Sequence, residues 1–199
     1  MTPAARPQGR SVGTRHALLE AARVVFGERG FSAASVAEIV RRAGSSVGSL
    51  YHHFGGKNEL FLALYDAWDR ELAARAASAV TAVRAAGEAD PVAQFAAGAR
   101  AFLVGCWERR VVSRLFVDGD GPPGFGMLRR QRTQQWVRHN VTLLRAEERA
   151  VDRAMAAILT TVLAGAGREV VACRDDAEAA ALIDAVIGLL AGLPRAEGG

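Results

Sequence analysis

A short segment bounded by glycine at both ends constrains this chain more than any other feature. The residues from Ala43 to Lys57 read AGSSVGSLYHHFGGK. Gly44 ends one helical pattern and the Gly55-Gly56 pair closes the next, which leaves a helix of only about seven residues, Ser46 to His52. Lys57 follows at the start of another pattern and is the only lysine among 25 basic residues. We interpret the segment as a tight turn, a very short helix with a polar exposed face, and a cation suited to a phosphate.

Hydrophobic residues recur with helical spacing along nearly the whole chain, and no stretch shows convincing strand alternation. Half of the 199 residues are hydrophobic, which indicates a folded protein with a sizeable core. We therefore expect an all-α fold. Ser35 and Glu38 form a capping box, whereas DGDGPPGFG (Asp118 to Gly126) must be a loop. The expected helices cover about residues 14–29, 35–43, 46–52, 58–86, 91–109, 127–144, 148–166 and 176–193.

The excess positive charge lies entirely in the first third of the chain. Residues 1–60 hold eight basic and four acidic side chains, whereas the remainder has 17 of each. A basic module attached to a neutral one is typical of a protein that binds a polyanion through one part only. A merely solvated basic surface is the alternative interpretation.

The two helices flanking Gly44 have the dimensions of a helix-turn-helix. Leu50 and Phe54, four residues apart, would pack inward and hold the short helix in place. Gly48 costs a helix roughly 1 kcal/mol relative to alanine. Its presence makes sense if another backbone, such as that of a duplex, must come close. The residues left outward or at the margins are Ser46, Val47, Ser49, Tyr51 and His52.

This arrangement resembles the DNA-binding domain of the TetR family of transcriptional regulators over about residues 12–72. The matching positions are Thr14 to Phe26, Gly30-Phe31, Ser35, the runs AEIVRRAG and SVGSLYHHF, Lys57 and Leu60. The resemblance implies a homodimer whose two recognition helices enter successive major grooves of a palindromic operator. It also implies a C-terminal helical domain that binds a small molecule and thereby releases the DNA.

The resemblance assigns roles within a recognition motif at residues 35–54. Tyr51 and His52 would contact the DNA backbone or bases, and Lys57 would contact a phosphate. Ser35 would present the start of its helix to another phosphate. The groove floor would be met by Ser46, Val47, Gly48 and Ser49. Two positions depart from the usual pattern of the family. Ser45 stands where an apolar residue is usual, and Val47 stands where a basic or polar residue is common.

The implied domains are a disordered basic arm (1–11), the helix-turn-helix domain (12–72), and an effector-binding and dimerisation domain (73–199). The last helix supports dimerisation, because from Ala180 to Leu193 its only polar side chain is Asp184. A helix apolar on all sides must be buried on all sides. We expect a two-fold four-helix interface; a monomer with a large core is the alternative. The expected interface residues are Met155, Ile158, Leu159, Val162, Ile183, Val186, Ile187 and Leu190.

Aromatic residues are scattered over the helices between these two regions, with a few polar groups among them. A mostly apolar pocket with a few polar groups is typical of small-molecule sites, although core packing explains the same residues nearly as well. We expect the loop from Asp118 to Gly126 to gate this pocket. The candidate ligand-binding residues are Trp68, Phe102, Cys106, Trp107, Phe116, Phe125, Trp136, His139 and Asn140.

Other kinds of site find little support. Residues 119–124 match GxGxxG by letter, but Pro122 and Pro123 offer no N–H groups to a pyrophosphate. A calcium loop would need a glutamate where Arg129 stands. The histidines and the two cysteines lack zinc spacing, and no activated nucleophile is evident. We expect no enzyme activity, metal or cofactor, and a soluble cytoplasmic protein without a membrane segment.

We therefore expect a dimeric DNA-binding regulator, most simply a repressor released from a palindromic operator by an unknown small-molecule effector. One alternative is a dimeric DNA-binding protein without an effector. Another is an all-helical enzyme with an incidental helix-turn-helix.

Overall fold

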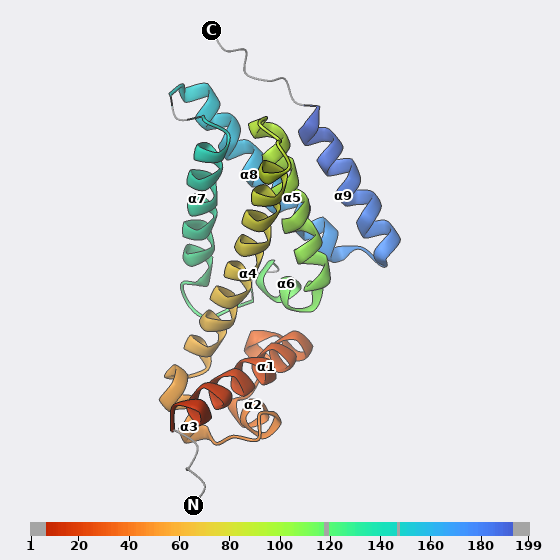
Figure 1. Cartoon of the computed structure of the whole chain (residues 1–199). Coiled ribbons are helices and arrows are strands. Elements are labelled where there is room, and N and C mark those ends of the chain that lie inside the picture. Colours follow the sequence, from red (N-terminus) through yellow and green to blue (C-terminus); the bar gives the residue numbers. More distant parts are fainter. Residues whose placement is uncertain (1–6, 118–119, 147, 193–199) are drawn as a thin grey trace, which may run out of the picture. The chain divides into compact units, whose positions relative to one another are not determined.

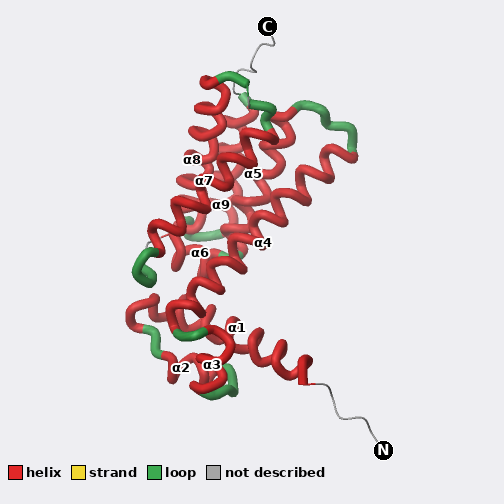
Figure 2. Tube along the Cα trace, turned by 90° about the vertical axis from the view of Figure 1, so that its left-hand side faces the viewer, coloured by secondary structure: helices red, strands yellow, loops and turns green. Residues whose placement is uncertain are grey.

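The computed structural model describes residues 7–117, 120–146 and 148–192, with side chains from Ser11 onward. The described residues form α-helices and loops but no β-strand (Figure 2), so the expected all-α fold is confirmed. The helices are α1 (Pro7–Ala33), α2 (Val36–Arg42), α3 (Val47–Phe54), α4 (Lys57–Ala85), α5 (Pro91–Glu108), α6 (Arg110–Val117), α7 (Phe125–Leu143), α8 (Ala150–Ala172) and α9 (Asp176–Ala191).

Several helix boundaries differ from the expected ones, and three of these differences are large. Helix α1 begins at Pro7, so residues 7–11 of the expected arm are helical, and residues 1–6 lie outside the described part. Helix α6 is separate, because the backbone leaves helical geometry at Arg109. Helix α8 continues through Gly167 to Ala172. A Cβ at Gly167 would lie 3.4 Å from the Phe102 ring, so this glycine permits close packing and does not end the helix.

The described residues form two compact units, which Figure 1 shows in sequence colours. The first contains the chain up to Trp68 together with Leu115–Phe125, and the second contains Asp69–Arg114 and the chain from Gly126 onward. The boundary within α4 therefore precedes the expected one after residue 72. The segment Leu115–Phe125, expected in the C-terminal domain, belongs to the first unit.

The first unit combines three packed helices, α1, α2 and α3, with an aromatic core. Helices α1, α2 and α3 pack against one another. The ring of Phe61, which is fully buried, lies 5.0 to 5.4 Å from four other rings. Tyr65 and Trp68 extend the cluster along α4. Large rings bury the most apolar area per side chain, and their edge-to-face contacts stabilise the core further. The four rings around Phe61 are Phe26, Phe31, Phe116 and Phe125.

A carboxylate from the Leu115–Phe125 segment also binds the end of α1. Asp120 accepts hydrogen bonds from the Ser32 hydroxyl at 2.9 Å and from the Ser32 N–H at 3.2 Å. Gly30 breaks α1 just before this point with φ 74° and ψ 173°, a conformation open essentially to glycine alone. A Cβ at Gly30 would lie 2.8 Å from the Asp120 carboxylate. The expected end of the first helical run at Gly30 is thus confirmed as a break.

The second unit is built on α5, α8 and α9, which pack against one another. Its core includes Leu103, Val170 and Ile183, all at most 4% exposed. Helix α8 is the one described helix long and apolar enough to cross a membrane. Its buried side chains Leu159 and Leu163 belong to this core, as those of an internal helix do.

We predict that Asp120→Asn lowers the melting temperature at neutral pH. The hydrogen bond from the Ser32 N–H, assisted by the Ser32 hydroxyl and the charge of Lys57, holds the pKa of Asp120 below its ordinary value. The resulting stabilisation is present above an ordinary pKa of about 4 and is lost as the pH falls through the lowered folded-state value.

Thermal melts of wild type and variant at pH 7 and pH 3 would check this prediction. The two proteins should differ most at pH 7, and the difference should shrink as the pH falls below about 4. Glu148→Gln, an exposed carboxylate in the second unit, is the control and should match the wild type at both values. A difference in melting temperature that is as large at pH 3 as at pH 7 would contradict the electrostatic origin.

Candidate nucleic-acid interface and C-terminal pocket

Helix α3 is a short rod fixed at both ends by local hydrogen bonds. At its start the Ser46 hydroxyl oxygen accepts the N–H of Ser49 at 3.1 Å. At its end Gly55 is left-handed, with φ 87°, and its N–H donates to the carbonyl of Tyr51 at 2.8 Å. The helix runs from Val47 to Phe54, two residues further than expected at its end, and the expected Gly55 supplies the cap.

The two faces of α3 have different environments. Leu50 is fully buried and Phe54 is 9% exposed, whereas Val47 is 47% and Tyr51 53% exposed. The guanidinium of Arg15 stacks over the Phe54 ring at 4.9 Å. The structure therefore leaves the predicted face of α3 open to solvent. Its exposed members are Ser46, Val47, Gly48, Tyr51 and His52, while Ser49 is half-buried.

Gly48 has no packing role inside the chain. A Cβ added there would meet no atom closer than the Ser46 hydroxyl at 4.0 Å. The space in front of this position is therefore available to an external surface.

Ser35 begins α2 in the same way that Ser46 begins α3. Its hydroxyl oxygen accepts the N–H of Glu38 at 3.1 Å, which is the serine half of the expected capping box. Gly44, with φ 58°, makes the turn between α2 and α3. Both serines thus order the first turns of their helices, where free N–H groups and the helix dipole favour an anion.

Lys57 lies where it was expected but does not have the expected partner. Its ammonium donates to the carbonyls of Phe31 at 2.8 Å, Ser32 at 3.3 Å and Ala34 at 2.9 Å. It also lies 4.5 Å from the centre of the Phe31 ring. An ammonium has three N–H donors, and three carbonyls take them. Lys57 therefore closes the carbonyl end of α1, and its contact with a phosphate stays a prediction.

The second unit contains a half-open pocket of about 360 Å³. Helix α4 lines it with a stripe spaced by three or four residues, and α5, α7 and α8 supply the other walls. Four of the nine predicted ligand residues line it: Phe102, Trp136, His139 and Asn140. Asn140 is buried and donates to the Thr160 hydroxyl at 2.9 Å.

The other five predicted ligand residues lie elsewhere. Three belong to the aromatic core of the first unit: Trp68, Phe116 and Phe125. Trp107 donates its indole N–H to Asp176 at 2.8 Å and is 9% exposed. Cys106 is buried, which raises the pKa of its thiol to about 12. The expected gate is also corrected, because none of the described loop residues 120–124 lines the pocket.

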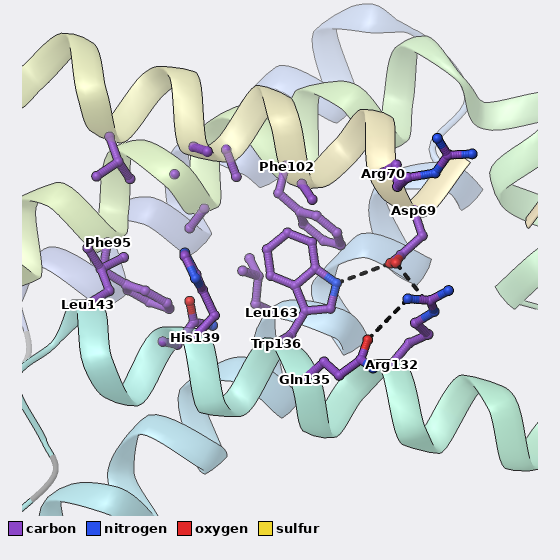
Figure 3. Close-up of a pocket in the computed structure, with 17 residues that line it drawn as sticks. Asp69, Arg70, Phe95, Phe102, Arg132, Gln135, Trp136, His139, Leu143 and Leu163 are labelled. Carbon is purple, nitrogen blue, oxygen red and sulfur yellow. Dashed lines mark hydrogen bonds and ion pairs between the residues drawn. The ribbon is translucent and has the colours of Figure 1, made fainter. Parts of the chain in front are cut away.

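The charged end of the pocket was missed by sequence reasoning. Asp69 accepts the indole N–H of Trp136 at 3.1 Å and lies 3.8 Å from the guanidinium of Arg132 (Figure 3). Arg132 donates in turn to the side-chain carbonyl of Gln135 at 3.2 Å. The one sequence signal for this end of the pocket was helical spacing, which places Asp69 on the same face of α4 as Ala73 and Ala76.

The expected interface residues of α8 and α9 divide into two groups. Leu159, Ile183 and Leu190 are at most 9% exposed and belong to the core of their own chain, which corrects their assignment. Val186 and Ile187 are partly buried against that core. Three residues of α8 form an exposed apolar face: Met155 at 43%, Ile158 at 56% and Val162 at 52%. Leu189 of α9, which was not predicted, is 76% exposed.

We predict that Lys57→Ala destabilises the protein. Leaving the carbonyls of Phe31, Ser32 and Ala34 without the ammonium should lower the free energy of unfolding by about 1–3 kcal/mol. Chemical denaturation would measure this change, with Arg41→Ala, an exposed cation on α2, as a control that stays near wild type. Unchanged stability, together with a salt dependence of DNA binding reduced by one phosphate contact, would show that Lys57 binds a phosphate and does not stabilise the end of α1.

Comparison with known proteins places this geometry in a family. Residues 18–64 match the model of bacterial regulatory proteins of the tetR family. The chain is 44% identical over 70 residues to the HTH-type transcriptional repressor AcnR of Corynebacterium efficiens, which is 35% of each protein. It is 46% identical over 55 residues to the repressor KstR2 of Mycobacterium tuberculosis, 28% of each. The matches thus span about a third of these curated relatives or less.

The fold as a whole also has counterparts. A TetR-family transcriptional regulator from Pectobacterium atrosepticum superimposes with a TM-score of 0.61 at 25% identity, over 94% of each chain. The N-terminal domain is thus similar in sequence to the DNA-binding domain of bacterial regulatory proteins of the tetR family, and the helical architecture of the chain is similar to that of a TetR-family regulator.

Proposed function

We propose that this protein is a transcriptional repressor that binds DNA through α3 and releases it when a small molecule occupies the C-terminal pocket. The observation that carries the proposal is the two-faced rod of α3. Buried Leu50 and Phe54 fix its orientation, and the opposite face is polar and open. A helix presented in this way fits the major groove of B-DNA.

Each exposed position of α3 has a physical role in such a complex. Gly48 permits the closest approach of a duplex, since nothing within the chain occupies the space before it. Val47 offers an apolar contact to a thymine methyl, and Tyr51 and His52 offer hydrogen bonds to bases or phosphates. The helix starts at Ser35 and Ser46 present N–H groups to the backbone. The net positive charge of residues 1–60 attracts the polyanion.

Dimerisation would use the exposed apolar face of α8 together with Leu189 of α9. Large apolar side chains grouped on one helix are costly in water and typical of association sites. A two-fold axis through this face would pair α8 and α9 of each protomer in a four-helix interface. Small residues on α9, Ala181, Ala185 and Gly188, would let the helices approach closely.

The pocket supports a ligand-responsive repressor over a DNA-binding dimer without an effector. Core packing alone does not require a hollow of 360 Å³ with a charged end. The relatives named as repressors support a regulator over an enzyme, and a cytoplasmic location follows from access to DNA.

The coupling route would run along α4, because this one helix contributes both to the aromatic core of the first unit and to the pocket wall of the second. Two recognition helices must be spaced by about one DNA turn, roughly 34–36 Å, or a multiple of it. A ligand that displaces α4 would change this spacing and weaken simultaneous binding of two half-sites.

Selection of fragments from a random DNA pool, followed by gel-shift titration, tests this function. Wild-type protein should enrich an inverted repeat, and Tyr51→Ala should weaken binding to it by about 1–3 kcal/mol while leaving the melting temperature unchanged. Met127→Ala, similarly exposed on α7, is the control. Equal affinity of wild type and Tyr51→Ala would show that this side chain does not contact the operator.

The dimer is tested by charge insertion at the centre of the α8 face. We predict that Ile158→Glu converts a dimer to a monomer in light scattering and abolishes gel-shift binding, since a buried unpaired carboxylate is strongly unfavourable. Val111→Glu, at a comparably exposed valine of α6, should leave the dimer intact. A dimer that survives Ile158→Glu would place the interface on another surface.

A further inference from the structure

We propose that the pocket of the second unit takes a small uncharged ligand, an apolar chain or ring with one hydroxyl group, which rests on the proposed function only in that it names the chemical class of the effector. Two observations carry the proposal. The charged side chains at one end of the pocket already have partners within the protein, and a buried amide on the pocket wall has an unused acceptor.

The body of the pocket is apolar and is hollowed by small side chains. Helix α4 contributes alanines where it faces α5, and a Cβ at Gly98 of α5 would already lie 3.1 Å from the Val80 side chain. The helices are therefore close, and the space beside them exists because Ala73, Ala76 and Ala77 fill little of it. The larger apolar members of the wall are Val80, Phe95, Phe102, Leu143 and Leu163.

Charged side chains gather at one end of the pocket, but they interact with other groups of the protein. Asp69 accepts the Trp136 indole N–H at 3.1 Å and lies 3.8 Å from the guanidinium of Arg132 (Figure 3). Arg132 also donates to the side-chain carbonyl of Gln135, and Arg70 has an interaction of its own within the protein. A charged ligand head would leave water without gaining a free counter-charge, which is strongly unfavourable. This end therefore disfavours carboxylates and amines alike.

A buried amide forms another part of the wall, and its orientation is fixed by a chain of hydrogen bonds. Asn140 lines the pocket and is 5% exposed. Its amide N–H donates to the Thr160 hydroxyl at 2.9 Å, and that hydroxyl donates to the carbonyl of Ala156 at 2.7 Å. Because the hydroxyl hydrogen is used on Ala156, Thr160 can only accept from Asn140. The amide nitrogen must therefore face Thr160, and the amide oxygen must lie on the other side.

The side-chain oxygen of Asn140 is thus left as an acceptor. Within the described part of the chain no donor binds this oxygen, and it is not sealed into the core. A nearly buried acceptor without a donor is costly, so a ligand that brings one N–H or O–H to it gains a hydrogen bond. A hydroxyl supplies this hydrogen without a charge. A ketone of the same shape does not supply it.

The remaining polar groups of the wall require nothing further from a ligand. His139 and Gln135 both line the pocket, but both side chains are exposed and remain in contact with solvent. A sugar or a nucleotide would place most of its polar groups against the apolar wall, which is costly. One hydroxyl on an apolar body is the composition that matches the wall.

Calorimetric titration of the full chain with four probes of equal chain length tests the class. The probes are 1-octanol, 2-octanone, octanoate and octylamine. Octanol should bind about five-fold more tightly than octanone, since it makes one more hydrogen bond. It should bind at least about ten-fold more tightly than octanoate or octylamine, whose charges would have to leave water.

Replacement of the amide tests the role of its oxygen. Asn140→Leu keeps a similar volume and removes the acceptor, so the preference for octanol over octanone should disappear. The two probes are compared within one variant, so a general loss of stability does not imitate this result. Asn58→Leu, at an exposed asparagine of α4 outside the pocket, is the control and should keep the five-fold preference.

Filling the apolar body tests the location of the site. Ala73→Leu should abolish octanol binding while the melting temperature of the free protein is retained. Ala74→Leu, at the next residue of α4, is exposed and outside the pocket, and should bind octanol like the wild type.

Four results would overturn the proposal. Octanoate or octylamine binding as tightly as octanol would overturn the uncharged class. Octanone binding as tightly as octanol to the wild type, or a preference for octanol that survives in Asn140→Leu, would overturn the hydroxyl contact. Absence of octanol binding, or octanol binding unchanged in Ala73→Leu, would overturn the site.

Gel-shift titration of the ligand-free protein separates this ligand class from the proposed function. Octanol binding without any operator binding would overturn the repressor and leave the ligand class standing. Operator binding by a protein that prefers octanoate or octylamine would do the reverse.

Discussion

The ring of Phe61 unites three segments of the chain that are far apart in sequence. It contacts Phe26 and Phe31 from α1, and Phe116 and Phe125 from either side of the loop before α7. Because interiors are close-packed, a ring surrounded in this way fixes the relative positions of all its neighbours. The rod of α3 rests on this arrangement, since α3 packs against α1 and its Leu50 and Phe54 are buried.

The polar groups around the end of α1 reinforce this core. A helix end leaves carbonyls without partners, and here the Lys57 ammonium binds those that follow the break at Gly30. Asp120 binds the Ser32 N–H and hydroxyl on the same turn, and the opposite charges favour each other. The single lysine of the chain thus has a structural task that an arginine, with a planar head, would perform less well with three converging carbonyls.

The interiors of the two units are packed with different kinds of residue. Large rings close the interior of the first, whereas alanine and glycine on α4 and α5 leave space in the second. Helix α4 contributes residues to both interiors, because the division between the two units falls within it.

The sequence by itself determined the helical fold, the cap at Ser35, the breaks at Gly30 and Gly55, and the two faces of α3. These features depend on backbone geometry and on neighbours within one or two turns, which the order of residues specifies directly. The tertiary structure alone decided which distant groups meet. Ser32 and Asp120 are 88 residues apart, and Asp69 and Trp136 are 67 apart.

The same distinction explains which site residues were misassigned. Phe116 and Phe102 are both apolar rings on helices, yet one closes a core and the other lines a pocket. Leu159 and Ile158 are adjacent, and only the direction in which each points makes one internal and the other exposed. Periodicity shows that a helix has an apolar face, but only the packed structure shows what that face meets, because the partners come from elements remote in the chain.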